Sequence, residues 1–395
     1  MTSYGGATRT HARRGLALLA GLALLGAACS SDEDDPAAGV EGETPGTDGT
    51  GGGGRGGEEG ATTEGGGLLA EVQSRGNLVC GVNDAVPGFG ITDEAGEFSG
   101  FDIDFCRVVA AAVLGDAEAV EFRPLTADQR FTALQSGEID VLIRNTTFTA
   151  TRDGSEGAAF ATTTFYDGQQ MMVRADAGFD TIESMDGTTV CVLSGTTTEL
   201  NLATRFAAGG LTVTPLTFPD NEQLQAAFVA GQCDGWTSDG SQLAGVRSAF
   251  PEADGGPEGL VILDEVFSKE PLGPAVRDGD DEWADAVNWA VLATIQAEEF
   301  GIGQADVQDA LTDENPDVLR FFGQPIDDGE GSTAVFDPGL GLDPEFAIAV
   351  VEQVGNYGEI FDRNVGAGSP LELDRGLNAL WDADEPGLMY APPYR

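Results

Sequence analysis

From residue 68 onward, short apolar runs alternate along the chain with longer stretches in which apolar and polar residues are mixed. The short runs predict strands and the longer stretches predict helices, because a buried strand is brief and apolar whereas a helix buries only one face. The predicted strands cover 78–82, 120–124 and 189–193, and the predicted helices cover 104–114, 127–136, 198–208 and 282–298. Strands that alternate with helices indicate an α/β fold with mostly parallel sheets.

One helix and strand pattern occurs twice. Residues 130–143 (RFTALQSGEIDVLI) and 224–237 (LQAAFVAGQCDGWT) both predict a helix, a glycine that ends it, an aspartate and a short strand. Gly137 and Gly231 suit the left-handed conformation that often follows a helix. Residues 68–395 are enough for two lobes of about 100–200 residues each, and the repeat predicts that these lobes are similar.

The first thirty residues have a pattern of their own. Arg9, Arg13 and Arg14 precede the apolar run 16–25, which is followed by small residues and then by Cys29. A basic start, a short apolar run and small residues are typical of a signal peptide, here 1–28, since a membrane-spanning helix needs about 20 apolar residues. The paired arginines also permit export by the twin-arginine route.

The surroundings of Cys29 resemble the lipobox of bacterial lipoproteins, in which the cysteine sulfur receives diacylglycerol. Gly26 replaces the leucine usual three residues before the cysteine, and Leu25 lies one place further back. Residues 30–67 are rich in Gly, Asp and Glu and contain no aromatic residue, which predicts a disordered tether over 29–67. Ordinary secretion with a free Cys29 is the alternative to a lipid anchor.

Charge and histidine usage exclude several classes of function. The formal net charge of -48 makes nucleic acid an improbable partner. The single histidine, His11, lies in the predicted signal peptide, so the mature chain would lack His-dependent nucleophiles, general bases and zinc ligands. Residues 278–281 (DGDD) lack the spacing of a calcium loop. We therefore expect no metal and no cofactor, although catalysis by carboxylates alone stays possible.

Four cysteines remain beyond Cys29, namely Cys80, Cys106, Cys191 and Cys233. An even number in an exported chain predicts two disulfides. Of the three possible pairings, Cys80–Cys106 with Cys191–Cys233 is preferred because each bridge would stay within one lobe, whereas crossed bridges would lock the lobes together. Four buried free thiols are the alternative.

Polar residues follow three of the predicted strands, in 144–153, 194–199 and 238–241. Open α/β sheets bind ligands at the carboxyl ends of their strands, and a helix that begins there favours anions. Two of these segments also have a purely structural explanation, since Thr196 and Glu199 have the spacing of a capping box and Asp239 would cap the helix after it.

Six segments resemble the periplasmic amino-acid-binding proteins of ABC importers, in the branch that binds general L-amino acids. They are 100–106 (GFDIDFC), 131–142 (FTALQSGEIDVL), 144–147 (RNTT), 192–202 (VLSGTTTELNL), 268–277 (SKEPLGPAVR) and 354–361 (VGNYGEIF). The resemblance implies the two-lobed type II solute-binding fold, with an α-rich C-terminal extension. It also implies a receptor that is not an enzyme, lies outside the cytoplasm, acts as a monomer and delivers an L-amino acid to a membrane permease.

The resemblance also implies roles for particular residues. Thr147 and Arg152 would hold the α-carboxylate of the amino acid together with Thr196 and Thr197, and Asp239 would take the α-ammonium. The chemistry agrees, because a zwitterion needs a bidentate cation at one end and an anion at the other. Two further candidates are Phe89, whose ring would pack on the ligand, and Asn145, which stands where serine is common.

The same resemblance predicts how the lobes are divided. One lobe would comprise 68–170 and 266–395, the other 171–265, with chain crossings near 169–173 and 266–272 that act as a hinge. Two other functions stay open: a dehydratase-like enzyme on this fold, which prephenate or arogenate would reveal, and an amino-acid sensor that does not serve transport.

Overall fold

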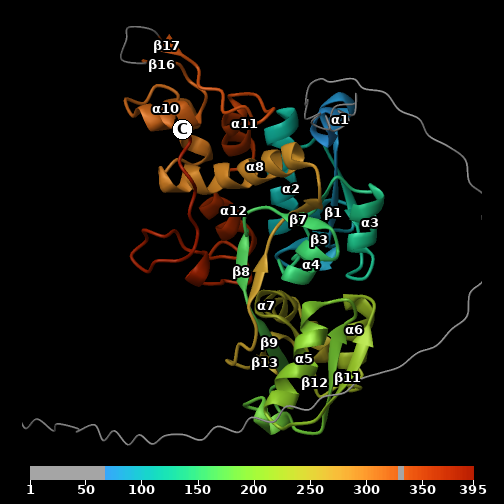
Figure 1. The fold of residues 1–395 in the computed structure, drawn as a ribbon. Helices are drawn as coiled ribbons and strands as arrows, with labels where there is room; N and C mark the ends of the chain where they lie inside the picture. Colours follow the sequence, from blue (N-terminus) through green and yellow to red (C-terminus); the bar gives the residue numbers. More distant parts are fainter. Residues whose placement is uncertain (1–66, 328–332) are drawn as a thin grey trace, which may run out of the picture. The chain divides into compact units, whose positions relative to one another are not determined.

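The computed structural model describes residues 67–327 and 333–395, and the predicted signal peptide, Cys29 and nearly all of the tether lie outside this range. Two five-stranded sheets organise the described chain (Figure 1). The first runs in the order β5-β1-β6-β15-β7 and the second in the order β11-β10-β12-β9-β13. The α/β prediction is therefore confirmed.

The two sheets share one pattern of strand directions. In the first, β1 (Leu78–Val82) is parallel to β5 (Val120–Pro124) and β6 (Val141–Leu142), while β15 (Ala275–Arg277) is antiparallel to β6 and to β7 (Ala158–Phe160). In the second, β10 (Thr188–Leu193) is parallel to β11 (Val213–Phe218) and β12 (Gly235–Asp239), while β9 (Gln169–Arg174) is antiparallel to β12 and to β13 (Leu260–Ile262). Similar lobes were predicted from the repeat, and the antiparallel strands were not.

The repeated helices end as the glycines predict. Helix α3 (Arg130–Ser136) is followed by Gly137 with φ 75°, and α6 (Asn221–Val229) is followed two residues later by Gly231 with φ 71°. Helix α3 begins three residues later than predicted because Thr126 and Gln129 close a turn with a backbone hydrogen bond of 3.2 Å. In both sheets the next segment is the strand, β6 or β12, that leads to the polar residues.

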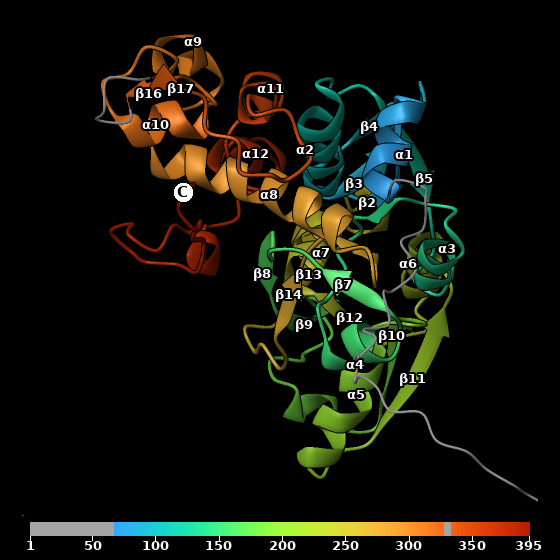
Figure 2. The ribbon, with the colours of Figure 1, turned by 45° about the horizontal axis from the view of Figure 1, so that its top comes forward.

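Helix α2 (Phe101–Leu114) is buried on nearly all sides, as expected for a helix in which most residues are apolar. It packs against α1 (Leu68–Arg75), α8 (Asp281–Glu299), α11 (Phe346–Gln353) and α12 (Tyr357–Asn364) (Figure 2). Together these helices form the core behind the first sheet.

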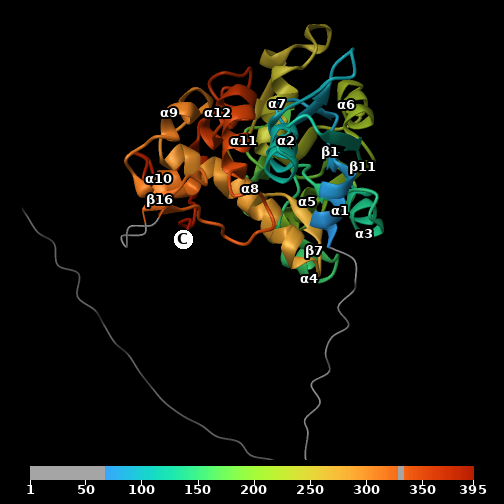
Figure 3. The ribbon, with the colours of Figure 1, turned by 90° about the horizontal axis from the view of Figure 1, so that it is seen from above.

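In the C-terminal region beyond α8, the short helices α9 (Val307–Ala310), α10 (Pro316–Phe321), α11 and α12 gather around one end of α8 (Figure 3), with irregular segments between and after them. Two short strands, β16 (Ile326–Asp327) and β17 (Thr333–Ala334), pair within it. This is the α-rich extension that the family resemblance predicted.

A short antiparallel pair joins the regions of the two sheets. Strand β8 (Phe165–Asp167) precedes β9 and pairs with β14 (Glu270–Leu272), which precedes β15. The C-terminal region fixes this pair, since Tyr357 donates its hydroxyl to the carbonyl of Thr164 at 2.8 Å and Asn378 accepts from the backbone N–H of Tyr166 at 2.7 Å. The crossings predicted near 169–173 and 266–272 are next to it, and the lobe boundaries stay a prediction.

Both preferred disulfides are present. Cys80–Cys106 joins β1 to α2 with a Cα–Cα distance of 6.1 Å, and Cys191–Cys233 joins β10 to the segment before β12 at 5.6 Å. The alternative of four free thiols is therefore wrong. Within 67–327 and 333–395, no helix has the length and apolar character needed to cross a membrane.

Candidate functional site

A small cavity lies where the carboxyl ends of β6, β10 and β12 come together. Its volume is about 20 Å3, and its lining consists of Arg130, Arg144, Asn145, Thr147, Leu193, Thr196, Thr197, Thr198, Ser238, Asp239 and Gln242. A single water molecule needs about 10–15 Å3 of such space. An amino acid therefore enters only if the two sides of the cavity separate.

Side chains from the two sheets meet directly across this cavity. Asn145 donates from Nδ2 to Asp239 Oδ2 and to Gln242 Oε1, both at 3.1 Å. The hydroxyls of Thr147 and Thr197 lie 3.3 Å apart. This arrangement is closed, and binding would exchange some of these contacts for contacts with a ligand.

Asp239 is a buried carboxylate with an incomplete set of partners. It is 5% exposed, and Oδ1 has no hydrogen-bond partner among the described residues, whereas Oδ2 accepts from Asn145. Although Asp239 precedes α7 (Gly240–Ser248), its side chain makes no capping hydrogen bond. Burial, followed by the charges of Asp167 and Glu270, raises its pKa well above the usual range. A bound cation would satisfy Oδ1 and stabilise the ionised form.

The beginning of α5 (Thr197–Ala208) divides its threonines between two roles. Thr196 Oγ1 accepts from the backbone N–H of Glu199 at 3.1 Å, so Thr196 caps the helix and also lines the cavity. Thr197 donates its hydroxyl to Glu270 Oε2 at 2.8 Å. Because this bond uses the only proton of the hydroxyl, the Thr197 oxygen can take part in further hydrogen bonds in this arrangement only as an acceptor.

The approach of the two lobes at this point requires a glycine. Gly195, just before α5, has φ 70°, and a Cβ there would lie 2.0 Å from Asp128 Oδ1. The neighbouring Ser194 donates its hydroxyl to Asp128 Oδ2 at 2.6 Å. A larger side chain at 195 would therefore obstruct the closed arrangement.

Arg152 lies just behind the cavity wall. It is on the short helix α4 (Ala150–Gly154), is 4% exposed, and donates from Nη1 to the carbonyl oxygen of Thr147 at 2.8 Å. Its guanidinium carbon is 5.2 Å from the centre of the Phe131 ring. Burial lowers the pKa of Arg152, which the charges of Glu156, Glu270 and Asp239 partly offset. It does not line the cavity in this closed conformation, but it touches Thr147, which does.

Asn145 occupies a strained position at the centre of the site. Its φ is 28°, which is uncommon for a residue other than glycine and is typical of functional sites. Asp102 accepts from its backbone N–H at 2.6 Å, and Asn83 donates to its Oδ1 at 2.6 Å. These bonds aim the amide nitrogen of Asn145 at Asp239.

The structure does not bring Phe89 to the cavity. The ring is fully buried, and its centre lies 5.8 Å from that of Phe101 and 5.2 Å from that of Phe165, both edge-on. Phe89 is thus part of the aromatic core of the first lobe, and its suggested contact with a ligand has no support in this arrangement.

Two arginines that line the cavity had no role assigned from sequence. Arg130, at the start of α3, is 3% exposed, and its Nη2 donates to the carbonyl of Gly195 at 3.3 Å while its Nε has no partner among the described residues. Burial, with the charges of Arg152 and Arg144, lowers its pKa well below the usual range. Arg144 donates from Nε to the carbonyl of Leu125 at 2.7 Å, and burial lowers its pKa to about 10.

The sequence did contain a signal for these two arginines. Arg130 opens the first repeat unit, and Arg144 opens the polar segment after its strand, which is the edge where ligands bind in open α/β sheets. Gln242, in the first turns of α7, was missed as well. Its contact with Asn145 depends on the approach of the two lobes, which no local pattern reveals.

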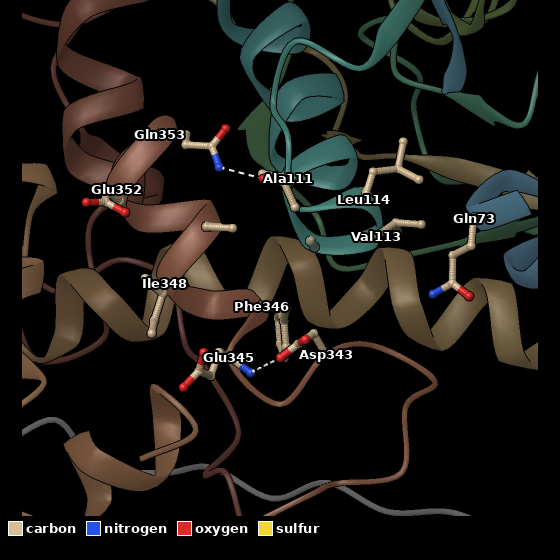
Figure 4. A pocket seen from close by; sticks show the side chains of 13 residues that line it. Gln73, Ala111, Val113, Leu114, Asp343, Glu345, Phe346, Ile348, Glu352 and Gln353 are labelled. Atoms are coloured by element: carbon tan, nitrogen blue, oxygen red, sulfur yellow. Dashed lines mark hydrogen bonds between the residues drawn. The ribbon is translucent and has the colours of Figure 1, made fainter. Parts of the chain in front are cut away.

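A larger hollow lies elsewhere on the protein and has different chemistry. It measures about 520 Å3 and lies between α2 and α11 (Figure 4). Its polar rim is acidic, with Asp343, Glu345 and Glu352, and no arginine or lysine lines it. The smaller cavity combines Arg130, Arg144 and Asp239 at the carboxyl ends of the strands, where open α/β sheets bind ligands, and we therefore take it as the candidate site. No group of three or more potential metal-ligating side chains is found in the described part of the chain.

Known proteins resemble this chain over most of its length. The general L-amino acid-binding periplasmic protein AapJ of Rhizobium johnstonii is 47% identical over 85% of this chain and 95% of its own length. The glutamate/glutamine/aspartate/asparagine-binding protein BztA of Rhodobacter capsulatus is 45% identical over 83% of this chain and 93% of its own.

A solved structure gives the same result in three dimensions. An ABC transporter periplasmic binding protein from Brucella ovis, determined with glutathione bound, is 46% identical, covers 84% of this chain and 100% of its own, and has a TM-score of 0.77. Residues 78–301, which contain both sheets and the cavity, match a family of receptors for external solutes. The chain therefore belongs to the bacterial extracellular solute-binding proteins, family 3.

Proposed function

We propose that this protein captures L-amino acids outside the cytoplasm and delivers them to the permease of an ABC importer. The proposal rests above all on the buried Asp239, which lines the cavity together with Arg130 and Arg144 and whose Oδ1 has no hydrogen-bond partner among the described residues. The names of the Rhizobium and Rhodobacter relatives support an amino acid as the ligand.

In the proposed complex, the ligand ammonium lies against Asp239 and takes the place of the Asn145 amide at that carboxylate. The α-carboxylate accepts hydrogen bonds from Arg152 and Thr147 of the first lobe. Thr197 and the free N–H groups at the start of α5 complete its set of donors from the second lobe. Since these groups belong to both lobes, the ligand stabilises the closed form, and the permease can distinguish the closed, loaded receptor from the open, empty one.

The lobes in this proposal are those predicted from sequence, 68–170 with 266–395 and 171–265, which turn about the β8 and β14 pair. Cys29 carries the lipid anchor and 29–67 is the tether, so a monomeric receptor stays near its permease on the outer face of the membrane. The three relatives named above are binding proteins by name, which favours a receptor over a dehydratase.

A thermal-shift screen of the mature, ligand-stripped protein against the twenty L-amino acids tests the proposal. A ligand at a hundred times its Kd adds about 2.7 kcal/mol to the free energy of unfolding, which is a rise of several degrees in Tm. The D-enantiomer of the best ligand is the matched control, because it cannot place all three groups around Cα on the same partners. If no L-amino acid raises Tm, or if L and D forms act equally, the proposal is wrong.

Delivery needs a separate experiment. Membrane vesicles that contain the cognate permease should take up the labelled amino acid only when the receptor is added. Uptake that is the same with and without receptor would instead favour a sensor. Incubation with prephenate or arogenate should leave both compounds unchanged, and conversion of either would establish the enzyme alternative.

A further inference from the structure

We infer that Arg130 and Arg144 form a second anion subsite opposite Asp239, which selects amino acids with a second carboxylate at the far end of the side chain. This inference rests on the proposed function and names the class of ligand for the same site. Its first basis is the lining of the cavity, to which both arginines contribute.

The buried arginines around this cavity lack carboxylate partners. No ion pair within 4.0 Å joins Arg130, Arg144 or Arg152 to any acidic side chain in 67–327 or 333–395. Arg375, in contrast, holds Glu298 at 2.9 Å. A buried charge without a partner is costly, so two of them lining one cavity, with Arg152 just behind its wall, indicate a site built to receive anions.

The hydrogen bonds of these two arginines leave donors free. Arg130 makes one long bond, 3.3 Å, to a carbonyl oxygen, and its buried Nε has no partner among the described residues. The Arg144 guanidinium uses Nε for the carbonyl of Leu125 and makes no other hydrogen bond within the described chain. A guanidinium has five N–H donors, and a carboxylate can accept two parallel hydrogen bonds from it. Both arginines therefore have donors left for a ligand carboxylate.

The balance of charge favours a ligand with two carboxylates. The α-carboxylate and α-ammonium of any amino acid would engage Arg152 and Asp239, which leaves Arg130 and Arg144 without a counter-charge. The charges of Asp102, Asp84 and Asp239 partly offset the effect of burial on the pKa of Arg144, but none of these carboxylates forms an ion pair with it within 4.0 Å, and Asp102 already accepts the Asn145 N–H. A second ligand carboxylate supplies the missing negative charge.

The wall of the cavity disfavours apolar side chains. Leu193 is the one apolar residue among those that line it, and the others present guanidinium, amide, hydroxyl or carboxylate groups. An apolar side chain would desolvate these groups without giving them a hydrogen bond. The chemistry therefore fits an α-amino acid head followed by a second carboxylate, as in glutamate, aspartate or the two-carboxylate peptide glutathione.

Calorimetry on the mature, ligand-stripped protein tests this assignment. L-glutamate should bind about 10- to 100-fold more tightly than L-glutamine, which has the same shape but no second charge, since hydrogen bonds to charged groups exceed neutral ones by that factor. L-aspartate and reduced glutathione are compared as well, to distinguish a free acidic amino acid from a peptide as the source of the second carboxylate. If glutathione binds more tightly than both L-glutamate and L-aspartate, the site is assigned to a γ-glutamyl peptide.

The Arg130→Gln variant tests whether this arginine causes the preference for L-glutamate over L-glutamine. It should weaken L-glutamate binding about 10- to 100-fold and change L-glutamine binding by less than about 3-fold, so that the preference collapses. Arg130→Lys should restore part of the preference, since it restores the charge. Arg123→Gln is the matched control, because Arg123 is half exposed on β5 and pairs only with Glu121 at 2.8 Å. If Arg130→Gln does not fold, the same comparison is made with Arg144→Gln.

The outcomes separate this inference from the function on which it rests. Should glutamine bind as tightly as glutamate, or should Arg130→Gln weaken both ligands equally, the second anion subsite is refuted while an amino-acid receptor stands. Should no amino acid bind to the parent protein, the proposed function itself fails. A preference for glutamate that Arg130→Gln abolishes supports both.

Discussion

Replacing Asp239 with asparagine should weaken binding and stabilise the ligand-free protein at the same time. The substitution keeps the shape of the side chain and an oxygen that can accept from Asn145, but it removes the charge that would hold the ligand ammonium. A residue that acts only through packing would not produce opposite changes in affinity and stability.

The loss of affinity follows from the burial of the group. Asp239 is 5% exposed, and removing one member of a buried charge pair costs about 2–5 kcal/mol, or roughly 30-fold to several thousand-fold in Kd. The expected effect on binding is therefore large compared with that of a neutral hydrogen bond, which contributes about 0.5–1.5 kcal/mol.

The gain in stability follows from the raised pKa of Asp239. Between the ordinary pKa of the unfolded carboxyl, about 3.9, and the raised pKa of the folded one, the folded protein holds a proton that the unfolded chain has lost. The free energy of unfolding therefore falls as pH rises through this window. Near pH 8 the variant, which has no carboxyl group to titrate at this position, should therefore have a larger free energy of unfolding and a higher Tm than the parent.

Calorimetry with the best amino acid and thermal melts of ligand-free protein near pH 4 and pH 8 provide the assay. The control is Asp176→Asn, an exposed carboxylate in the second lobe, which should leave affinity and Tm unchanged. The reasoning is refuted if Asp239→Asn binds as tightly as the parent, or if it is less stable than the parent near pH 8 in the absence of ligand.

Three further predictions concern other parts of the protein. Arg152→Lys should weaken amino-acid binding about 10-fold in calorimetry, since an ammonium lacks the paired donors of a guanidinium; an unchanged Kd would remove Arg152 from the site. Cys29→Ala should release the exported protein from the membrane fraction, and equal fractionation of variant and parent would refute the lipid anchor. Burial raises the pKa of Asp102 to about 7, so the free energy of unfolding of the parent should fall by up to about 4 kcal/mol between about pH 4 and pH 7 on account of this group. Asp102→Asn should remove that part of the fall. Denaturant titrations in which the variant loses as much free energy of unfolding over this pH range as the parent would contradict the prediction.

The parts of the fold that could be predicted from sequence are those encoded locally. Apolar runs gave β1, β5 and β10, and the glycines at 137 and 231 gave the ends of the repeated helices. The disulfides could be predicted from the requirement that each stay in one lobe. The antiparallel strands β9 and β15 could not, because their pairing joins segments far apart in the chain and has no local signature.

Some residues of the candidate site could be predicted from sequence motifs, and others could be recognised only in the structure. Motif resemblance pointed to Asn145, Thr147, Thr197 and Asp239, and the structure brings all four to one cavity. Phe89 lies in the aromatic core and not at this cavity, and its contact with a ligand stays a prediction, because sequence alone does not separate a buried core aromatic from a cavity aromatic. Arg130 was missed because its significance lies in being buried without a carboxylate partner, a property that exists only in three dimensions.

A crystal structure of the mature protein with the amino acid that raises its Tm most is the most direct test of the central claim. We expect the ligand between the two lobes, with its ammonium about 2.7–2.9 Å from Asp239 and its α-carboxylate at the same distance from the Arg152 guanidinium. Density for the ligand in the hollow between α2 and α11, or in the cavity with its ammonium away from Asp239, would contradict it.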